Sequence, residues 1–259
     1  MGEAFMPRRG GLPRQLGGGT PIGELEVGTS VYMNFGGVLT EFLITQQGLP
    51  SSAYDSSCDG TWLLMKECYT TKECYTTDVW NSFAPPHTYE ESEIHSYLDT
   101  TTLALFDEEI QSIIKEAQIP VWAGESNDST TINIPAHIFL LSAYELGFSG
   151  YDIGWAAPEG ACLEHFYGCQ YIWEGEGDDS RIVQYPDNSL RIAYYNGSAV
   201  RWWMRSQTYN ANPNSGGSTH YVDTDGTGDS IRSDEIMGIR PSLILPSETK
   251  VDKKFRVKP

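Results

Sequence analysis

The chain has 259 residues, of which 39% are hydrophobic and 12% aromatic, and its formal net charge at pH 7 is −18. This composition is typical of a globular protein and excludes a largely disordered chain. Three of the 17 basic residues lie in the first twenty positions and five in the last ten, so residues 21–249 carry nine basic against 33 acidic residues, a net charge of −24. Because such a body repels phosphates, we expect no nucleic-acid partner.

The two ends of the chain differ from this body. Residues 1–20 are rich in glycine and proline and contain Arg8, Arg9 and Arg14, which predicts an extended arm that docks in an assembly. Residues 248–259 are expected to form a basic tail. Either these ends dock on an acidic neighbour, such as another copy of the chain, or they are solvated and their charge is incidental. The absence of a long apolar run and of a secretory signal predicts a soluble protein made in the cytoplasm, without membrane insertion.

Strands are expected first in the globular part. Two β-branched and aromatic segments, 31–34 and 38–44, flank Gly36-Gly37 and predict a hairpin, and residues 61–65 predict a further strand. A hexapeptide, Lys-Glu-Cys-Tyr-Thr-Thr, then occurs twice in tandem over residues 66–77. Two copies are too few for a solenoid, so this segment is interpreted as a surface loop enlarged by duplication.

Helices are expected in the middle of the chain. Residues 92–105 begin with acidic residues, which favour a helix N-terminus. Asp107 can cap a second helix that buries Ile110, Ile113 and Ile114 and ends before Pro120. A strand at 137–141 and a short helix near 160–166 follow.

The last third of the chain predicts short strands with long loops, at 181–183, 190–195, 200–205, 220–222 and 238–245. Helices in the middle followed by strands indicate an α+β class. We expect one domain over residues 21–247, with short mixed and antiparallel sheets, two to three helices and long loops.

Two adjacent tryptophans, Trp202 and Trp203, mark one of these strands. Neighbouring side chains on a strand point to opposite faces, so one indole is expected in the core and the other on the surface, where an exposed indole indicates contact with a ligand. The segment 238–246 is expected to be one buried closing strand with Ile239, Leu243 and Leu245 on one face and Arg240 beside a proline.

Aromatic, asparagine and arginine residues gather around this strand. Such residues combine rigid apolar area with adaptable hydrogen bonding, as in binding surfaces for proteins and sugars. The predicted ligand-binding residues are Tyr194, Tyr195, Asn196, Arg201, Trp202, Trp203, Arg205, Tyr209, Asn210, Asn212 and His220. As an alternative, Arg205 and Arg240 pair with buried acids and stabilise the fold.

A carboxylate-rich segment offers the best candidate metal ligands, Asp223, Asp225 and Asp229. Their alternation with glycine resembles a calcium loop, but Thr227 stands where a third acid is usual and no helices flank it. The alternative is a hairpin turn in which Asp-Gly supplies positive φ. The five cysteines contain no CxxC pair and are expected to be free thiols, with a Cys162–Cys169 disulfide as a lesser possibility. No cofactor is expected.

Four sequence blocks carry a resemblance to a known family. They are residues 47–64, residues 139–147, Trp202-Trp203-Met204-Arg205-Ser206 and Gly238-Ile239-Arg240-Pro241. In this order they resemble an uncharacterised domain family of tailed phages, prophages and surface proteins of gut Firmicutes. That family is distantly similar to the C-type-lectin-like fold of formylglycine-generating enzymes and variable phage adhesins. Gln207 departs from the proline that relatives carry after Arg-Ser.

The resemblance implies a C-type-lectin-like domain in a virion-associated protein. We expect it to be non-enzymatic, to attach to other virion proteins through its arm, to bind a host or mucosal surface glycan or protein, and to form a homo-oligomer. The alternative is a decoration or assembly protein whose domain makes only structural contacts. An enzyme of the formylglycine-generating type is the third possibility, but the cysteine pair that such enzymes carry late in the chain has no counterpart after Cys169.

Overall fold

Most of the chain after the first eighteen residues is described by the computed structural model. The described residues are 19–74, 88–124, 129–149, 153, 156–170, 172–174, 181–184, 186–208 and 218–259. The predicted arm with Arg8, Arg9 and Arg14 lies outside this range, apart from its last two residues.

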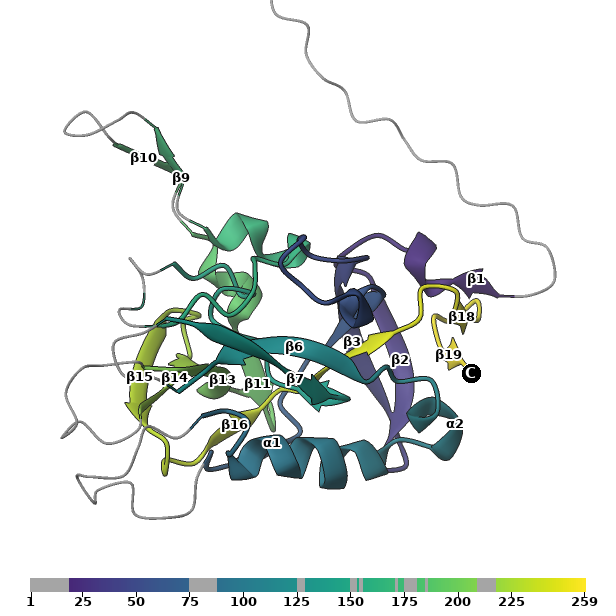
Figure 1. Cartoon of the computed structure of the whole chain (residues 1–259). Helices are drawn as coiled ribbons and strands as arrows, with labels where there is room; N and C mark the ends of the chain where they lie inside the picture. Colours follow the sequence, from purple (N-terminus) through teal and green to yellow (C-terminus); the bar gives the residue numbers. More distant parts are fainter. Residues whose placement is uncertain are drawn as a thin grey trace, which may run out of the picture.

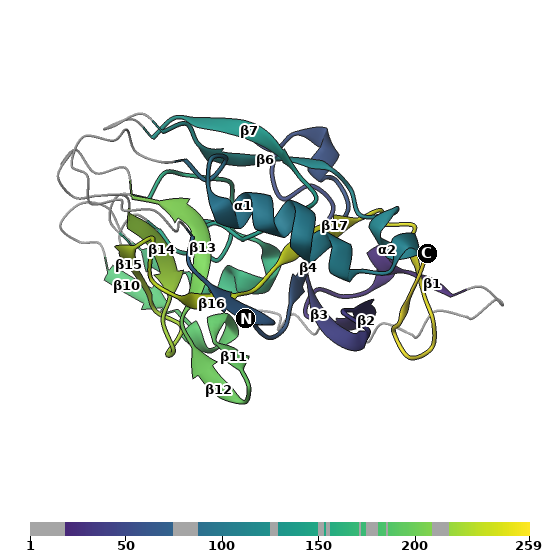
Figure 2. The ribbon, with the colours of Figure 1, turned by 90° about the horizontal axis from the view of Figure 1, so that it is seen from below.

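Two five-stranded sheets form the body of the molecule and lie at opposite ends of it in both views (Figures 1 and 2). The first sheet is antiparallel and has the order β2-β3-β4-β17-β8. These strands span Ser30–Phe35, Val38–Gln47, Thr61–Met65, Ser242–Leu245 and Ile138–Phe139. The predicted hairpin at Gly36-Gly37 is confirmed, with φ of 58° and 76° at the two glycines.

The second sheet has the order β15-β14-β13-β16-β5. Its strands span Gly228–Arg232, Ser218–Val222, Trp202–Gln207, Met237–Ile239 and Thr70–Lys72. Strands β13 and β16 run parallel, and the other pairs are antiparallel. Strand β13 therefore has a hydrogen-bonded neighbour on each side.

The segment 238–245 connects the two sheets. The sequence predicts one closing strand here, but the segment divides at Arg240-Pro241 into β16 in one sheet and β17 in the other. Because proline has no N–H to donate to a ladder, the strand ends there. The expected core residues Ile239, Leu243 and Leu245 are all fully buried, so the segment contributes to the interior of both sheets.

Residues 93–105 form a continuous helical segment, as predicted. It consists of α1 (Glu93–Tyr97), a π turn (Leu98–Thr102) and a 3₁₀ turn (Leu103–Leu105), and the Ser92 hydroxyl caps it by accepting from the His95 N–H at 3.1 Å. The second helix, α2 (Glu108–Gln111), is shorter than expected. Asp107 precedes it but accepts hydrogen bonds from the Asn34 side chain instead of capping the helix.

Pro120 does not end a helix. It lies within strand β6 (Ala117–Trp122), which pairs with β7 (Thr131–Ala136) in a separate two-stranded sheet that the sequence pattern does not reveal. Short 3₁₀ turns complete the helical elements at Ile22–Glu24, Ser56–Cys58, Glu164–Cys169 and Asn188–Arg191. The third of these replaces the short helix expected near 160–166.

The first copy of the tandem hexapeptide is part of the second sheet, so its interpretation as a surface loop is wrong. Thr70–Lys72 form edge strand β5, paired with β16, and the Cys68 side chain that precedes it is buried. Cys74, the cysteine of the second copy, is also buried. Residues 75–77 lie outside the described residues.

The expected C-terminal tail folds against the body. Strands β18 (Lys250–Val251) and β19 (Val257–Lys258) form a hairpin, and β18 also pairs with β1 (Thr20–Pro21). Val251 and Val257 are buried. Two further hairpins complete the fold: β9 (Ile172–Glu174) with β10 (Arg181–Gln184), and β11 (Ala193–Tyr195) with β12 (Ser198–Val200).

Strands and a few short helices thus build the described chain, which agrees with the predicted α+β class. Within the described ranges, the helices are too short or too polar to cross a membrane.

Candidate functional site

Both tryptophans of strand β13 are completely buried. The indole N–H of Trp202 donates to the Arg191 carbonyl at 3.0 Å, and that of Trp203 donates to the Lys72 carbonyl at 2.8 Å. The two rings do point to opposite faces, but β13 is covered on both faces and all six of its residues are buried. The expectation of one exposed indole is therefore wrong.

Arg205 lies on the same strand and forms a buried ion pair. Its guanidinium binds both carboxylate oxygens of Glu145, each at 2.6 Å, and neither side chain has any exposed surface. The backbone carbonyls of Pro120 and Leu140 accept from the remaining N–H groups at 3.1 and 2.9 Å. Burial opposes the charged guanidinium, but Glu145 outweighs it and raises the pKa of Arg205. This arrangement confirms the alternative in which Arg205 stabilises the fold.

A second carboxylate, Glu159, completes this cluster. It accepts from the Trp122 backbone N–H at 2.7 Å and from the Ser206 hydroxyl, and burial raises its pKa. The Tyr54 hydroxyl donates to Glu145 at 2.9 Å and, with its ring nearly fully buried, has its pKa raised well above the ordinary value. The Arg205 guanidinium thus binds the carboxylate of Glu145, whereas it reaches Glu159 only at the backbone carbonyl, 3.3 Å away.

The buried charge cluster of Arg205, Glu145, Glu159, Tyr54 and Ser206 is sealed from solvent. A Cβ at Gly160, whose φ is +104°, would lie 2.0 Å from the Tyr54 hydroxyl, so only glycine allows the loop to close over the cluster. Its side chains are buried and bonded to one another, and the cluster is interpreted as structural.

Arg240 has a different environment from Arg205. Its guanidinium donates to the carbonyls of Met65 at 2.9 Å and Arg191 at 3.5 Å and lies 4.9 Å from the centre of the Trp202 ring. Among the described residues it forms no ion pair with a carboxylate, so the alternative of a buried acid partner gains no support for this residue. Burial lowers its pKa to about 10. Backbone carbonyls and an aromatic face take the place of an anion.

His220 is also buried, with 1% of its surface exposed. Its Nε2 lies 3.4 Å from the Thr208 hydroxyl, and within the described chain its Nδ1 has no hydrogen-bond partner. Burial lowers its pKa to about 4, which keeps the ring neutral. Trp202, Trp203, Arg205 and His220 are thus interior residues and are not available to a ligand at the surface.

The cysteines are free thiols, as expected. Burial raises the pKa of Cys58 to about 11 and those of Cys68 and Cys162 to about 12. A thiol is a nucleophile only as the thiolate, so these three groups are unsuited to nucleophilic catalysis.

Four of the predicted ligand-binding residues remain on the surface. Hairpin β11–β12 carries Tyr194, which is 43% exposed, half-buried Tyr195 and exposed Asn196. Asn196 has φ of 51° and the following Gly197 has φ of 80°, a turn that matches the twist of a hairpin. Figure 2 shows the hairpin projecting from the edge of the molecule.

Arg201 follows this hairpin directly and is exposed. Its guanidinium binds the Asp223 carboxylate at 3.2 Å and lies 5.2 Å from the centre of the Tyr221 ring. The predicted Tyr209, Asn210 and Asn212 lie outside the described residues. The surviving surface, Tyr194, Tyr195, Asn196 and Arg201, is called the hairpin surface below.

The carboxylates proposed as metal ligands bind local groups instead. Asp225 accepts from the backbone and hydroxyl of Thr227 at 3.0 and 2.6 Å, and Asp229 accepts from the Ser230 N–H at 2.7 Å. The turn joins β14 to β15 with φ of +83° at Gly226, so the hairpin interpretation is confirmed. In the part of the chain that is described, no three His, Cys, Asp or Glu side chains converge as metal ligands. The calcium alternative gains no support from this arrangement.

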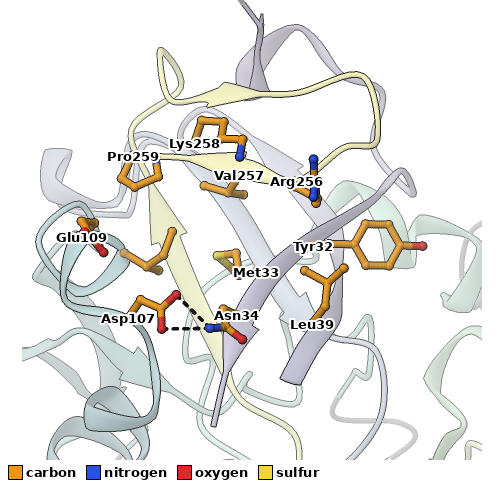
Figure 3. A pocket seen from close by; sticks show the side chains of 11 residues that line it. Tyr32, Met33, Asn34, Leu39, Asp107, Glu109, Arg256, Val257, Lys258 and Pro259 are labelled. Atoms are coloured by element: carbon orange, nitrogen blue, oxygen red, sulfur yellow. Dashed lines mark hydrogen bonds between the residues drawn. The ribbon is translucent and has the colours of Figure 1, made fainter. Parts of the chain in front are cut away.

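One open pocket, of about 260 Å³, lies where β2, α2 and the C-terminal hairpin meet (Figure 3). Its floor is apolar and includes Met33, Ile110 and Val257. Charged side chains surround this floor: Asp107, Glu109, Arg256 and Lys258. The sequence pattern did not indicate this pocket because residues 248–259 were expected to be a separate tail. Two sequence runs of opposite charge could have indicated this pocket: Asp107-Glu108-Glu109 and Lys253-Lys254-Phe255-Arg256.

Comparison with known proteins places this architecture in a family. A search of curated proteins and a search of solved structures gave no match. Residues 59–247, which include both five-stranded sheets except β2 and β3, match the family described as Domain of unknown function (DUF6273). That description gives no information on phage origin or on a lectin-like relationship, so both stay predictions. Because the match covers most of the chain, the protein belongs to the family Domain of unknown function (DUF6273).

Proposed function

We propose that this chain is a non-enzymatic, virion-associated protein whose C-type-lectin-like domain binds a host or mucosal surface ligand, glycan or protein, through the hairpin surface. The main support is the exposure of Tyr194, at 43%, on a hairpin with a well-formed turn. An exposed ring offers a flat apolar face to a sugar or a protein, and neighbouring Asn196 and Arg201 offer hydrogen bonds.

The chemistry of the interior favours binding over catalysis. Several titratable groups with shifted pKa values, among them Arg205, Glu159, Tyr54 and His220, are buried and face protein atoms. An active site would instead bring such groups together at the wall of a pocket. Around the pocket of Figure 3, the charged groups belong to exposed side chains.

A glycan-array screen of the full chain tests this function. We expect binding to a discrete set of glycans that Tyr194→Ala abolishes and Tyr167→Ala preserves. Tyr167 is the matched control because it is an exposed tyrosine, 53% accessible, on a different element. Equal binding by wild type and Tyr194→Ala would contradict the proposed surface.

A decoration or assembly protein is the second candidate, favoured by the exposed apolar side chains Val38 and Leu39, which are 65% and 56% accessible. Deleting residues 1–18, which leaves the β1–β18 pairing intact, separates the two candidates. If the chain is a displayed binding protein, the deletion abolishes its incorporation into particles but leaves ligand binding intact. A chain that binds no glycan or host surface with or without this segment is a purely structural part.

A further inference from the structure

The hairpin β18–β19 is a basic element on an acidic molecule. Residues 250–258 contain five basic residues and one acidic residue, whereas the whole chain has a net charge of −18. All five basic side chains are exposed. Lys250 and Lys258 lie directly opposite each other in the ladder, a like-charge pair that destabilises a hairpin. The fold alone therefore does not explain the composition of this element, which also lies beyond the residues matched to the family.

Phe255 at the tip of this hairpin has an unfavourable backbone conformation. Its φ is 58°, a region that glycine and asparagine adopt more easily than an aromatic residue. The conformation itself has a structural role, because the Phe255 carbonyl accepts from the Tyr32 N–H at 2.9 Å and closes the edge of β2. The aromatic ring has no such role and is 43% exposed. A bulky apolar side chain is thus presented to solvent where glycine would suit the fold better.

Complementary groups lie on the same side of the molecule, beside the hairpin. Exposed Asp107, Glu108 and Glu109 form an acidic run, and Asp107 and Glu109 line the pocket together with Arg256 and Lys258 (Figure 3). Leu39, which also lines the pocket, is 56% exposed. An acidic run and a partly apolar pocket therefore adjoin a basic hairpin with an exposed aromatic tip.

We propose that this face is an interface between two copies of the chain. In a twofold dimer, each surface patch contacts the corresponding patch of its partner, so an interface needs both complementary halves on one face. Phe255 of each protomer occupies the other protomer's pocket, and Lys253 and Lys254 lie against the acidic run. A buried aromatic side chain at the centre of an interface commonly supplies a large share of its binding energy. An acidic body disfavours self-association in general, so the basic hairpin determines which faces meet.

Sedimentation velocity of the full chain over a concentration series tests the dimer. Salt screens both the local attraction and the general repulsion, so ionic strength is held at about 0.15 M, where the Debye length is about 8 Å. We expect a monomer–dimer equilibrium that Phe255→Gly weakens at least about tenfold. Because glycine suits this backbone, the same variant keeps or raises the melting temperature, so loss of dimer cannot be attributed to unfolding.

Charge exchange tests the pairing itself. We expect the double variant Lys253→Glu, Lys254→Glu to weaken the dimer. The double variant Glu108→Lys, Glu109→Lys should weaken it as well, and a variant with all four substitutions should restore it. Ile236→Ser is the matched apolar control, because Ile236 is 68% exposed in the loop before β16, and it leaves association unchanged. A wild-type chain that stays monomeric at all concentrations, or a dimer that Phe255→Gly leaves unchanged, overturns the proposal.

Discussion

At the scale of single residues, alternation along β13 was predictable but its environment was not. Period-2 geometry correctly places Trp202 and Trp203 on opposite faces. That both faces are covered depends on segments outside this sheet, including Arg191, whose carbonyl accepts from Trp202, and β6, where the Pro120 carbonyl accepts from Arg205. The expectation of one exposed indole assumed that one face of the sheet contacts water. When both faces are covered, side chains on either face are buried.

The buried charge cluster gives a paired prediction. Glu145→Gln should destabilise the protein by about 3–5 kcal/mol, because it leaves the Arg205 guanidinium buried without its anion. Glu159→Gln should cost less, about 1–3 kcal/mol, because Arg205 meets Glu159 only at its backbone carbonyl and the substitution disturbs the hydrogen bonds from Trp122 and Ser206. Urea unfolding of both variants checks this. Equal losses would show that the two carboxylates share the charge of Arg205.

His220 predicts an acid-sensitive stability. Its pKa is about 4 when folded, against an ordinary value of 6.5, because burial disfavours the charged ring. Because folding lowers this pKa, neutral His220 contributes its full stabilisation of the folded state above pH 6.5. This contribution is progressively lost as the pH falls toward 4. We expect wild type to lose about 3 kcal/mol more than His220→Gln between pH 7 and pH 4, a value that follows from the pKa difference. Urea unfolding at both pH values measures it, and parallel pH profiles would contradict a neutral buried His220.

At the scale of elements, the sequence predicts local structure better than pairing. The helical segment 93–105 and the hairpin β2–β3 were both evident, because caps and Gly-Gly turns act over a few residues. Strand β6 was missed because Pro120 was interpreted as a helix stop. In a two-stranded sheet one side of each strand needs no ladder partner, so a proline is tolerated there.

Two turn glycines should respond differently to substitution. Gly197 and Gly226 both have φ near 80°, but a Cβ at Gly197 meets nothing within 4 Å, whereas one at Gly226 would lie 1.9 Å from the Asn188 carbonyl oxygen. Gly197→Ala should cost about 1–2 kcal/mol from backbone strain alone. Gly226→Ala should cost about 1–3 kcal/mol more, because the backbone at Asn188 must move. Thermal unfolding of both variants distinguishes them, and equal losses would mean that the β14–β15 turn is not packed against residue 188.

At the scale of the whole molecule, the α+β class followed from the sequence, but the arrangement of two sheets did not. Segment 238–245 connects the sheets, and residues 250–251 pair with residues 20–21. Contacts between such distant positions carry no local signal. The candidate site also differs from the predicted one, because the burial of its residues depends on such contacts between distant positions. Of the predicted binding residues that the structure describes, four lie inside and four stay at the surface.

The protein thus has an interior with buried tryptophans and arginines, and it presents exposed hairpins at its surface. The affinity of Tyr194→Ala for the strongest glycan found on the array, measured beside its free energy of unfolding, tests this division most directly. We predict at least about a tenfold loss of affinity with a stability change within about 0.5 kcal/mol, as for surface substitutions. Unchanged affinity at unchanged stability would show that ligand binding, if present, uses another face.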